Sequence, residues 1–247
     1  MRISVAQAQA LEERLGVPVR VAARHFHPYI RDVVTELACS GTTTLVSLPL
    51  APQSVDVYHA EVRRAARGFP DLVVRYAPSW GLEPKLIDAL RETVDEALDR
   101  FADATDVPVV LTAHSLPRHV ILAGDPYEEQ FRAMAAGVAA AIEAKGHPVR
   151  VAFQSQGMDG GDWLGPDLLT VFAELSAAGR TSAVVAAIGF VADHVETLYD
   201  LDIEAPQIAA RAGLARIERA ASMNTRRAFI DALEAIARPL LETPGSA

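Results

Sequence analysis

The sequence has very little cysteine and no long apolar run. Cys39 is the only cysteine among 247 residues, so the chain can form no internal disulfide and offers no thiolate set for a zinc ribbon or an iron–sulfur cluster. No apolar run approaches the roughly 18 residues that cross a bilayer, and the start lacks the apolar stretch of a secretory signal. We therefore expect a cytoplasmic protein without a transmembrane segment, with peripheral membrane contact left open.

Basic residues are also scarce relative to acidic ones. The 23 lysines and arginines are outnumbered by 32 aspartates and glutamates, which gives a net charge of -9. A nucleic-acid surface needs a basic stripe, and we find none. We therefore expect no nucleic-acid partner. Half of the residues are hydrophobic, which over this length allows a substantial core in one large domain or two small ones.

Familiar catalytic fingerprints are missing as well. There is no Gly-x-Ser-x-Gly elbow and no His-Glu-x-x-His zinc helix, and the glycine-rich stretch at residues 155–161 matches neither a Walker loop nor a dinucleotide fingerprint. These absences argue against serine hydrolases and metalloproteases of the common types.

Apolar runs typical of strands alternate with helical patterns along the whole chain. This alternation predicts an α/β fold with parallel sheets and right-handed crossovers. A boundary fits best near residues 101–106, giving one half at 1–104, a second at 105–224, and a last helix within 225–247 that packs back on the first half. The predicted strands are 17–23, 43–48, 72–76, 107–113, 149–153 and 183–188, and the predicted helices are 5–15, 29–38, 54–67, 83–101, 126–145, 167–178 and 225–241.

Titratable side chains follow two of the apolar runs. His114 comes directly after the run at 107–113, and Asp193, His194 and Glu196 come shortly after the run at 182–190. If these runs are neighbouring parallel strands, the side chains meet where open α/β sheets bind ligands. Such a cluster can bind a divalent metal or move protons. For His114 alone, a solvated loop histidine is the more common alternative.

Three carboxylates continue from this cluster at a spacing of four. On a helix, Glu196, Asp200 and Glu204 form one acidic ridge. Like charges at this spacing destabilise a helix, so the ridge favours a bound cation or proton, although a solvated acidic face is the alternative. Trp163, in a glycine-rich loop, is either a stacking wall for a flat ligand or a packing anchor.

Several motifs together resemble the ferrochelatase family, the lyases that insert ferrous iron into a porphyrin in haem biosynthesis. Their order and spacing match over roughly residues 105–240, and the combination is far more specific than any one piece. The motifs are Thr-Ala-His-Ser-Leu-Pro at 112–117, Gly-Asp-Pro-Tyr at 124–127, Gln-Ser at 154–155 with Trp-Leu-Gly-Pro at 163–166, and Phe-Val-Ala-Asp-His-Val-Glu-Thr-Leu-Tyr at 190–199.

The resemblance implies two Rossmann-like halves of the class II chelatase type, the first incomplete, with porphyrin in the cleft between them. It implies ferrous iron as a substrate and no permanently bound cofactor. It also implies that the catalytic residues His114 and Glu196 face each other across the macrocycle, supported by Asp193 and His194. The implied metal ligands are His114, Glu196, Asp200 and Glu204, and the implied porphyrin contacts are Arg24, Ser115, Trp163 and Phe190.

The sequence therefore favours a ferrous-iron chelatase that acts on protoporphyrin IX or coproporphyrin III. Two alternatives stay open. One is a tetrapyrrole- or metal-binding protein without turnover, and the other is a cobalt or nickel chelatase of the sirohydrochlorin type.

Overall fold

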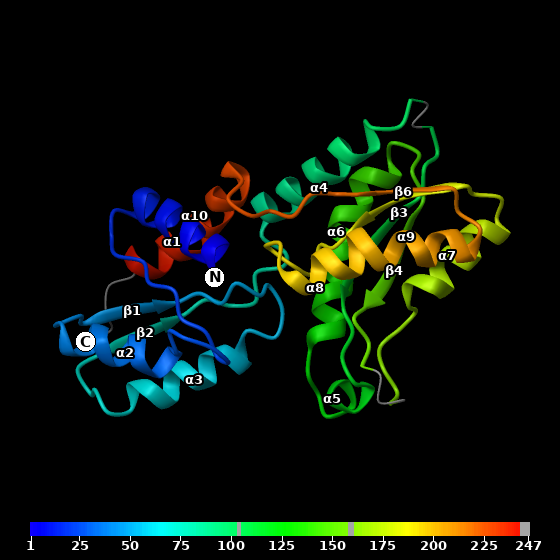
Figure 1. Cartoon of the computed structure of the whole chain (residues 1–247). Helices are drawn as coiled ribbons and strands as arrows, with labels where there is room; N and C mark the ends of the chain where they lie inside the picture. Colours follow the sequence, from blue (N-terminus) through cyan, green and yellow to red (C-terminus); the bar gives the residue numbers. More distant parts are fainter. Residues whose placement is uncertain (103–104, 158–160, 243–247) are drawn as a thin grey trace. The chain divides into compact units, whose positions relative to one another are not determined.

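The computed structural model describes residues 1–102, 105–157 and 161–242, and it divides the chain into two compact units (Figure 1). Unit 1 contains residues 1–85 together with the C-terminal segment from Asn224, and unit 2 contains residues 86–223. The boundary that we predicted at residues 104 and 105 falls next to residues 103–104, which lie outside the described residues.

Unit 1 is built on a short parallel sheet of β1 (Thr44–Ser47) and β2 (Val73–Tyr76). Helices α2 (Ile30–Cys39) and α3 (Asp56–Ala66) pack together, and a core of Ile30, Val34, Val62 and Leu72 lies among these elements. The last helix, α10 (Arg227–Glu242), packs against α1 (Arg2–Leu15) and β1.

The strand that we predicted at residues 17–23 is wrong. This segment is irregular apart from a single bridge between Ala23 and Tyr29. Pro18 has no N–H to give to a strand ladder. The N–H of Val19 donates instead to the Glu12 carboxylate, 2.8 Å away. The N–H of Ala23 likewise donates to the nearby Pro28 carbonyl, so these groups find local partners and the run does not enter a sheet.

Unit 2 contains a parallel sheet in the order β4-β3-β5-β6 (Figure 1). Its strands are β3 (Val109–His114), β4 (Val149–Gln154), β5 (Ser182–Ala186) and β6 (Arg216–Arg219). Val109 pairs with both Val149 and Val184, so β3 lies between β4 and β5. The predicted α/β class, parallel sheets and pairing of these runs are therefore confirmed.

Helices cover this sheet and explain why its central strands are continuously apolar. On one side, α7 (Leu168–Ala177) and α9 (Ala205–Ala212) pack on a cluster that includes Val110 and Val185. Helix α6 (Tyr127–Glu143) contacts β4, and its Phe131 ring lies 5.4 Å from that of Phe153. The unit also contains α4 (Pro84–Leu98), of which residues 86–98 belong here, and the short α5 (Arg118–Leu122).

The acidic ridge does not lie on one continuous α-helix, as we expected. After β5 the chain forms α8 (Val195–Leu198), a single turn, followed by the π-helix η1 (Tyr199–Glu204), which leads into α9. A π-helix has i→i+5 hydrogen bonds and more residues per turn than an α-helix, so residues four apart are aligned differently, and it is often found at functional sites. Across the described part of the chain, no helix combines the length and apolarity that a bilayer crossing requires.

Candidate functional site

His114 is the last residue of the central strand β3, so the sheet fixes its backbone. It pairs with Gln154 on β4, and its carbonyl accepts a hydrogen bond of 2.9 Å from the Tyr127 hydroxyl. The ring Nδ1 is hydrogen-bonded to the carbonyl of Ser115. Backbone and ring are therefore held from several directions, and the half-buried Nε2 side of the imidazole turns toward α8.

Glu196 on α8 contacts this imidazole directly. The Nε2 of His114 lies 3.0 Å from the Glu196 Oε1, so the predicted convergence of the two loops is present in this structure. The contact leaves no space for a ring between the two side chains. A porphyrin that lies between them, as the resemblance implied, must first break this hydrogen bond.

The hydrogen-bond partners limit where protons can lie on His114 and Glu196. The Ser115 carbonyl can only accept, so Nδ1 donates, and an ionised Glu196 can likewise only accept from Nε2. A hydrogen bond between Nε2 and Oε1 then requires one proton, carried by either the ring or the carboxyl group. In either form the pair holds one exchangeable proton between two atoms, which suits proton transfer.

His194 begins helix α8 and thereby orients Glu196. Its Nδ1 accepts from the N–H of Thr197 at 3.4 Å, and its own N–H donates to the Thr197 hydroxyl at 3.0 Å, which together form a capping box. Loss of water around the ring lowers the pKa of His194, opposed by the Glu196 carboxylate and reinforced by the His114 ring. A lowered pKa keeps Nδ1 unprotonated and able to accept.

Phe190 lies between the two histidines. Its ring centroid is 6.3 Å from that of His114 and 4.9 Å from that of His194, in edge-on arrangements. The predicted pocket residue Phe190 is thus part of the cluster, and it is half-buried. It supplies an apolar wall beside the His114–Glu196 pair.

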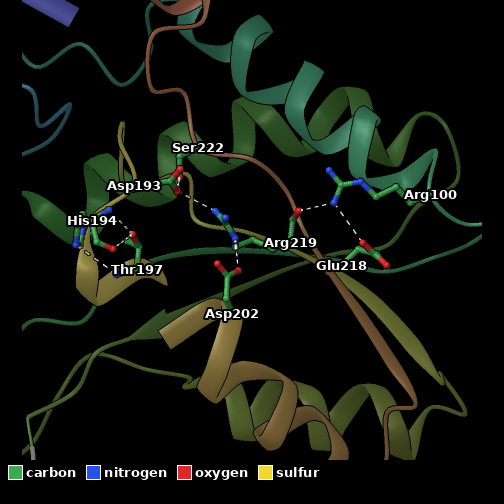
Figure 2. Close-up of polar contacts among 8 residues, drawn as sticks. All are labelled: Arg100, Asp193, His194, Thr197, Asp202, Glu218, Arg219 and Ser222. Atoms are coloured by element: carbon green, nitrogen blue, oxygen red, sulfur yellow. Dashed lines mark hydrogen bonds and ion pairs between the residues drawn. The ribbon is translucent and has the colours of Figure 1, made fainter. Parts of the chain in front are cut away.

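Asp193 is tied to strand β6, which sequence reasoning missed. Its Oδ1 accepts hydrogen bonds from Arg219 at 3.1 Å and from Ser222 at 2.7 Å, and Arg219 also donates to Asp202 at 2.6 Å (Figure 2). The sequence of β6, Arg-Ile-Glu-Arg, has no apolar run that would have indicated a strand. It is the edge strand of the sheet, where charged residues are common.

The remaining predicted metal ligands do not form a closed ion site. The Ser155 hydroxyl donates to Asp200, and Glu204 is exposed. Among residues 1–102, 105–157 and 161–242, no three histidine, cysteine or acidic side chains are gathered as an ion would require. In this structure His114 and Glu196 are in contact, but the expected set of His114, Glu196, Asp200 and Glu204 is not gathered into a preassembled centre.

Ser115, which we expected to contact porphyrin, is held within the protein by hydrogen bonds. Its side chain is fully buried, its hydroxyl donates to the Leu164 carbonyl at 2.8 Å, and its N–H donates to the Gln154 carbonyl at 2.7 Å. These bonds fasten the loop after β3 to the loop that carries Trp163. The contact of Ser115 with porphyrin stays a prediction.

The other two predicted porphyrin contacts lie in different units. The Trp163 ring packs over Gly157, where an added Cβ would come within 2.4 Å of the ring, and the side chain is half-buried. Arg24 belongs to unit 1, where its exposed guanidinium lies 5.5 Å from the Tyr58 ring centroid. Their contact with porphyrin stays a prediction.

Comparisons with known proteins agree with the resemblance. The family model described as Ferrochelatase matches residues 1–240. The chain is 38% identical to a ferrochelatase of Herpetosiphon aurantiacus over 220 residues, covering 86% of this chain and 71% of that protein. It is 34% identical to a coproporphyrin III ferrochelatase of Geobacillus sp. (strain WCH70), covering 95% of this chain and 79% of that protein.

Solved structures share the fold at low sequence identity. SirB from Bacillus subtilis with Fe3+ superimposes with a TM-score of 0.73 at 14% identity, covering 98% of this chain and 89% of that one. CbiX, the terminal enzyme for biosynthesis of sirohaem in denitrifying bacteria, gives a TM-score of 0.58 at 14% identity, with coverage of 96% and 89%. These likenesses confirm the expected chelatase-like α/β fold.

Proposed function

Because the chain belongs to the ferrochelatase family, we propose that it inserts ferrous iron into a porphyrin and that His114 and Glu196 handle the pyrrole protons. The observation that carries the assignment of residues is the 3.0 Å contact between His114 Nε2 and Glu196 Oε1 at the carboxyl end of the sheet. Ligands bind at this edge in open α/β folds.

The reaction exchanges two protons for one metal ion. The free-base porphyrin loses the hydrogens of two pyrrole nitrogens, Fe²⁺ takes their place, and no electron is transferred. An imidazole is a suitable base for such protons near neutral pH. The side chains of His114 and Glu196 are 33% and 48% exposed, so a proton accepted by the pair can pass on to water.

Substrate entry supplies a reason for the pair to open. We infer that the macrocycle separates Glu196 from His114 and that the proton between them leaves with the carboxyl group or passes to water, so that an unprotonated Nε2 faces a pyrrole nitrogen. The neighbouring Phe190 ring provides an apolar surface for a flat ligand beside the imidazole.

The acidic side chains on η1 fit a loose hold on iron before its insertion. Carboxylate oxygens bind divalent cations readily, and imidazole suits ferrous iron at the transfer itself. Asp200 contacts the Ser155 hydroxyl and Glu204 is exposed, so neither is committed to an arginine or lysine by the contacts described above. Carboxylates that are not gathered at one point favour passage of an ion over its permanent retention.

The metal-insertion step belongs to haem synthesis, and we propose that it takes place in the cytoplasm. The exposed Cys39 thiol is compatible with that reducing compartment. The substrate is protoporphyrin IX or coproporphyrin III.

The test is anaerobic incubation of the purified chain with Fe²⁺ and each porphyrin, followed by visible absorption. We expect the free-base bands to be replaced by those of the iron complex at a rate proportional to protein concentration. A red-shifted porphyrin spectrum without metallation would instead support a tetrapyrrole-binding protein. Metallation confined to sirohydrochlorin with cobalt or nickel would support a chelatase of the sirohydrochlorin type.

A further inference from the structure

Helix α8, which carries Glu196, is the first turn of a helical run that continues through η1 into α9. The core contacts of this run lie further along, at Leu201, Ala205 and Ala209. In the fully described segment of α8 and η1, Thr197 and Leu201 are buried, whereas Val195 is 86% exposed and Tyr199 is 58% exposed. Apolar packing therefore restrains the first turn less than the rest of the run, and polar contacts add to its restraint.

Arg219 contacts both ends of this segment. Its Nη1 lies 3.1 Å from Asp193, which precedes α8, and its Nε lies 2.6 Å from Asp202 within η1. Figure 2 shows the guanidinium between the two carboxylates, with Ser222 on the far side of Asp193. Glu196 lies between Asp193 and Asp202 in sequence, so the Arg219 side chain contacts the chain on both sides of the helical turn that carries Glu196.

Arg219 itself is firmly placed. It ends strand β6, where it pairs with Val185 of β5. Its side chain is only 22% exposed, and its carbonyl accepts a hydrogen bond of 3.2 Å from Arg100. Because β5 also pairs with β3, the strand of His114, the sheet links the guanidinium to the imidazole through two neighbouring strands.

We propose that Arg219 is a positioning residue that holds Glu196 against His114, an inference that rests on the proposed function. A planar guanidinium can donate from Nε and Nη1 in two fixed directions, which a lysine ammonium cannot reproduce. Removal of the guanidinium takes away the donor that Asp193 and Asp202 share, so the contact that joins the two sides of the turn is lost. Glu196 then leaves His114 for part of the time.

The first experiment measures porphyrin metallation by Arg219→Gln and Arg219→Lys. Misplacement of a catalytic group by about 1 Å can lower the rate about 100-fold, so we expect kcat to fall about 10- to 100-fold in Arg219→Gln. The KM for porphyrin should change little, and Arg219→Lys should recover part of kcat. Arg216→Gln is the matched control, since Arg216 lies on the same strand and pairs with Glu218, but its contacts do not reach α8 or η1.

A double-mutant cycle separates positioning from general damage to the fold. If Arg219 acts through Glu196, Arg219→Gln should reduce the rate less than threefold in a Glu196→Ala background, where the side chain that it positions is absent. An equal reduction in both backgrounds would overturn the proposal. So would a kcat for Arg219→Gln that equals that of Arg216→Gln.

Hydrogen exchange tests the restraint without any activity. Amides of residues 195–202 should exchange at least tenfold faster in Arg219→Gln than in the parent chain, and not in Arg216→Gln. Asp202→Asn should give a smaller increase, and it replaces Arg219→Gln if that variant does not fold. If the parent chain fails to metallate porphyrin, the proposed function fails, while unchanged exchange in these variants contradicts the role of Arg219 independently.

Discussion

Gly189 lies so close to Ala113 that no side chain fits between them. A Cβ at position 189 would lie 2.5 Å from the Cβ and 2.8 Å from the Cα of Ala113. The N–H of Gly189 also donates to the Thr112 carbonyl at 3.0 Å. Ala113 immediately precedes His114, and Gly189 immediately precedes Phe190. The absence of a side chain at one position therefore sets the spacing of the two loops that form the site.

Gly189→Ala should destabilise unit 2 and reduce metallation. The new methyl group meets backbone as well as side chain, so the strand end must move, at a cost of about 1–3 kcal/mol. Urea unfolding followed by Trp163 fluorescence measures this change. Gly137→Ala on α6 is the control, because its nearest neighbour is the flexible end of Ile87, at 3.2 Å. An equal, small change in both variants would show that the close approach has no energetic role.

His59 should make unit 1 less stable in acid. Its ring is buried, with Nδ1 2.9 Å from the Ser47 hydroxyl and Nε2 2.8 Å from the Ala77 carbonyl. Burial lowers the pKa of His59 below that of the unfolded chain. The unfolded state therefore binds the proton more readily, and stability falls as the pH drops below about 6.5, by at most about 1.4 kcal/mol per pH unit.

The measurement is urea unfolding between pH 8 and pH 5. The fluorescence of the buried Trp80 reports it in a Trp163→Phe background. Substitution His59→Gln should flatten the dependence of the unfolding free energy on pH, and substitution of the exposed His27 by Gln should not. Identical slopes in the parent and the His59→Gln variant would refute this assignment.

His194→Ala should impair catalysis more than His194→Asn. Alanine removes the acceptor for the Thr197 N–H, whereas asparagine is a favourable N-cap residue. Loss of a cap costs about 1 kcal/mol, which lowers the ratio of ordered to disordered helix by roughly fivefold. Both substitutions remove the ring that contacts Phe190, so their difference in kcat isolates the cap. Equal kcat values would rule out this role for His194.

The convergence of His114 and Glu196 was predictable from sequence because it follows from topology. Two apolar runs predicted parallel strands, and neighbouring parallel strands end at the same edge of a sheet. The motif resemblance then gave these two side chains their roles, and it supplied the family.

The Arg219 contacts were not predictable, because they join positions 17 and 26 residues apart through a strand without an apolar run. The π-helix was equally hidden, since the spacing of Glu196, Asp200 and Glu204 also suits an ordinary helix. The wrong strand prediction at 17–23 arose because the valines there fit a strand pattern. In the structure the Val19 N–H donates to the Glu12 carboxylate and not to a neighbouring strand.

The rates of His114→Ala and Glu196→Gln in anaerobic metallation of porphyrin test the central claim most directly. General acid–base groups contribute typically about 10²- to 10⁴-fold, so we predict losses in kcat within that range for both variants. Substitution of the exposed His119 by Ala or the exposed Glu174 by Gln should leave kcat unchanged. Metallation by folded His114→Ala and Glu196→Gln at the rate of the parent chain would contradict the account.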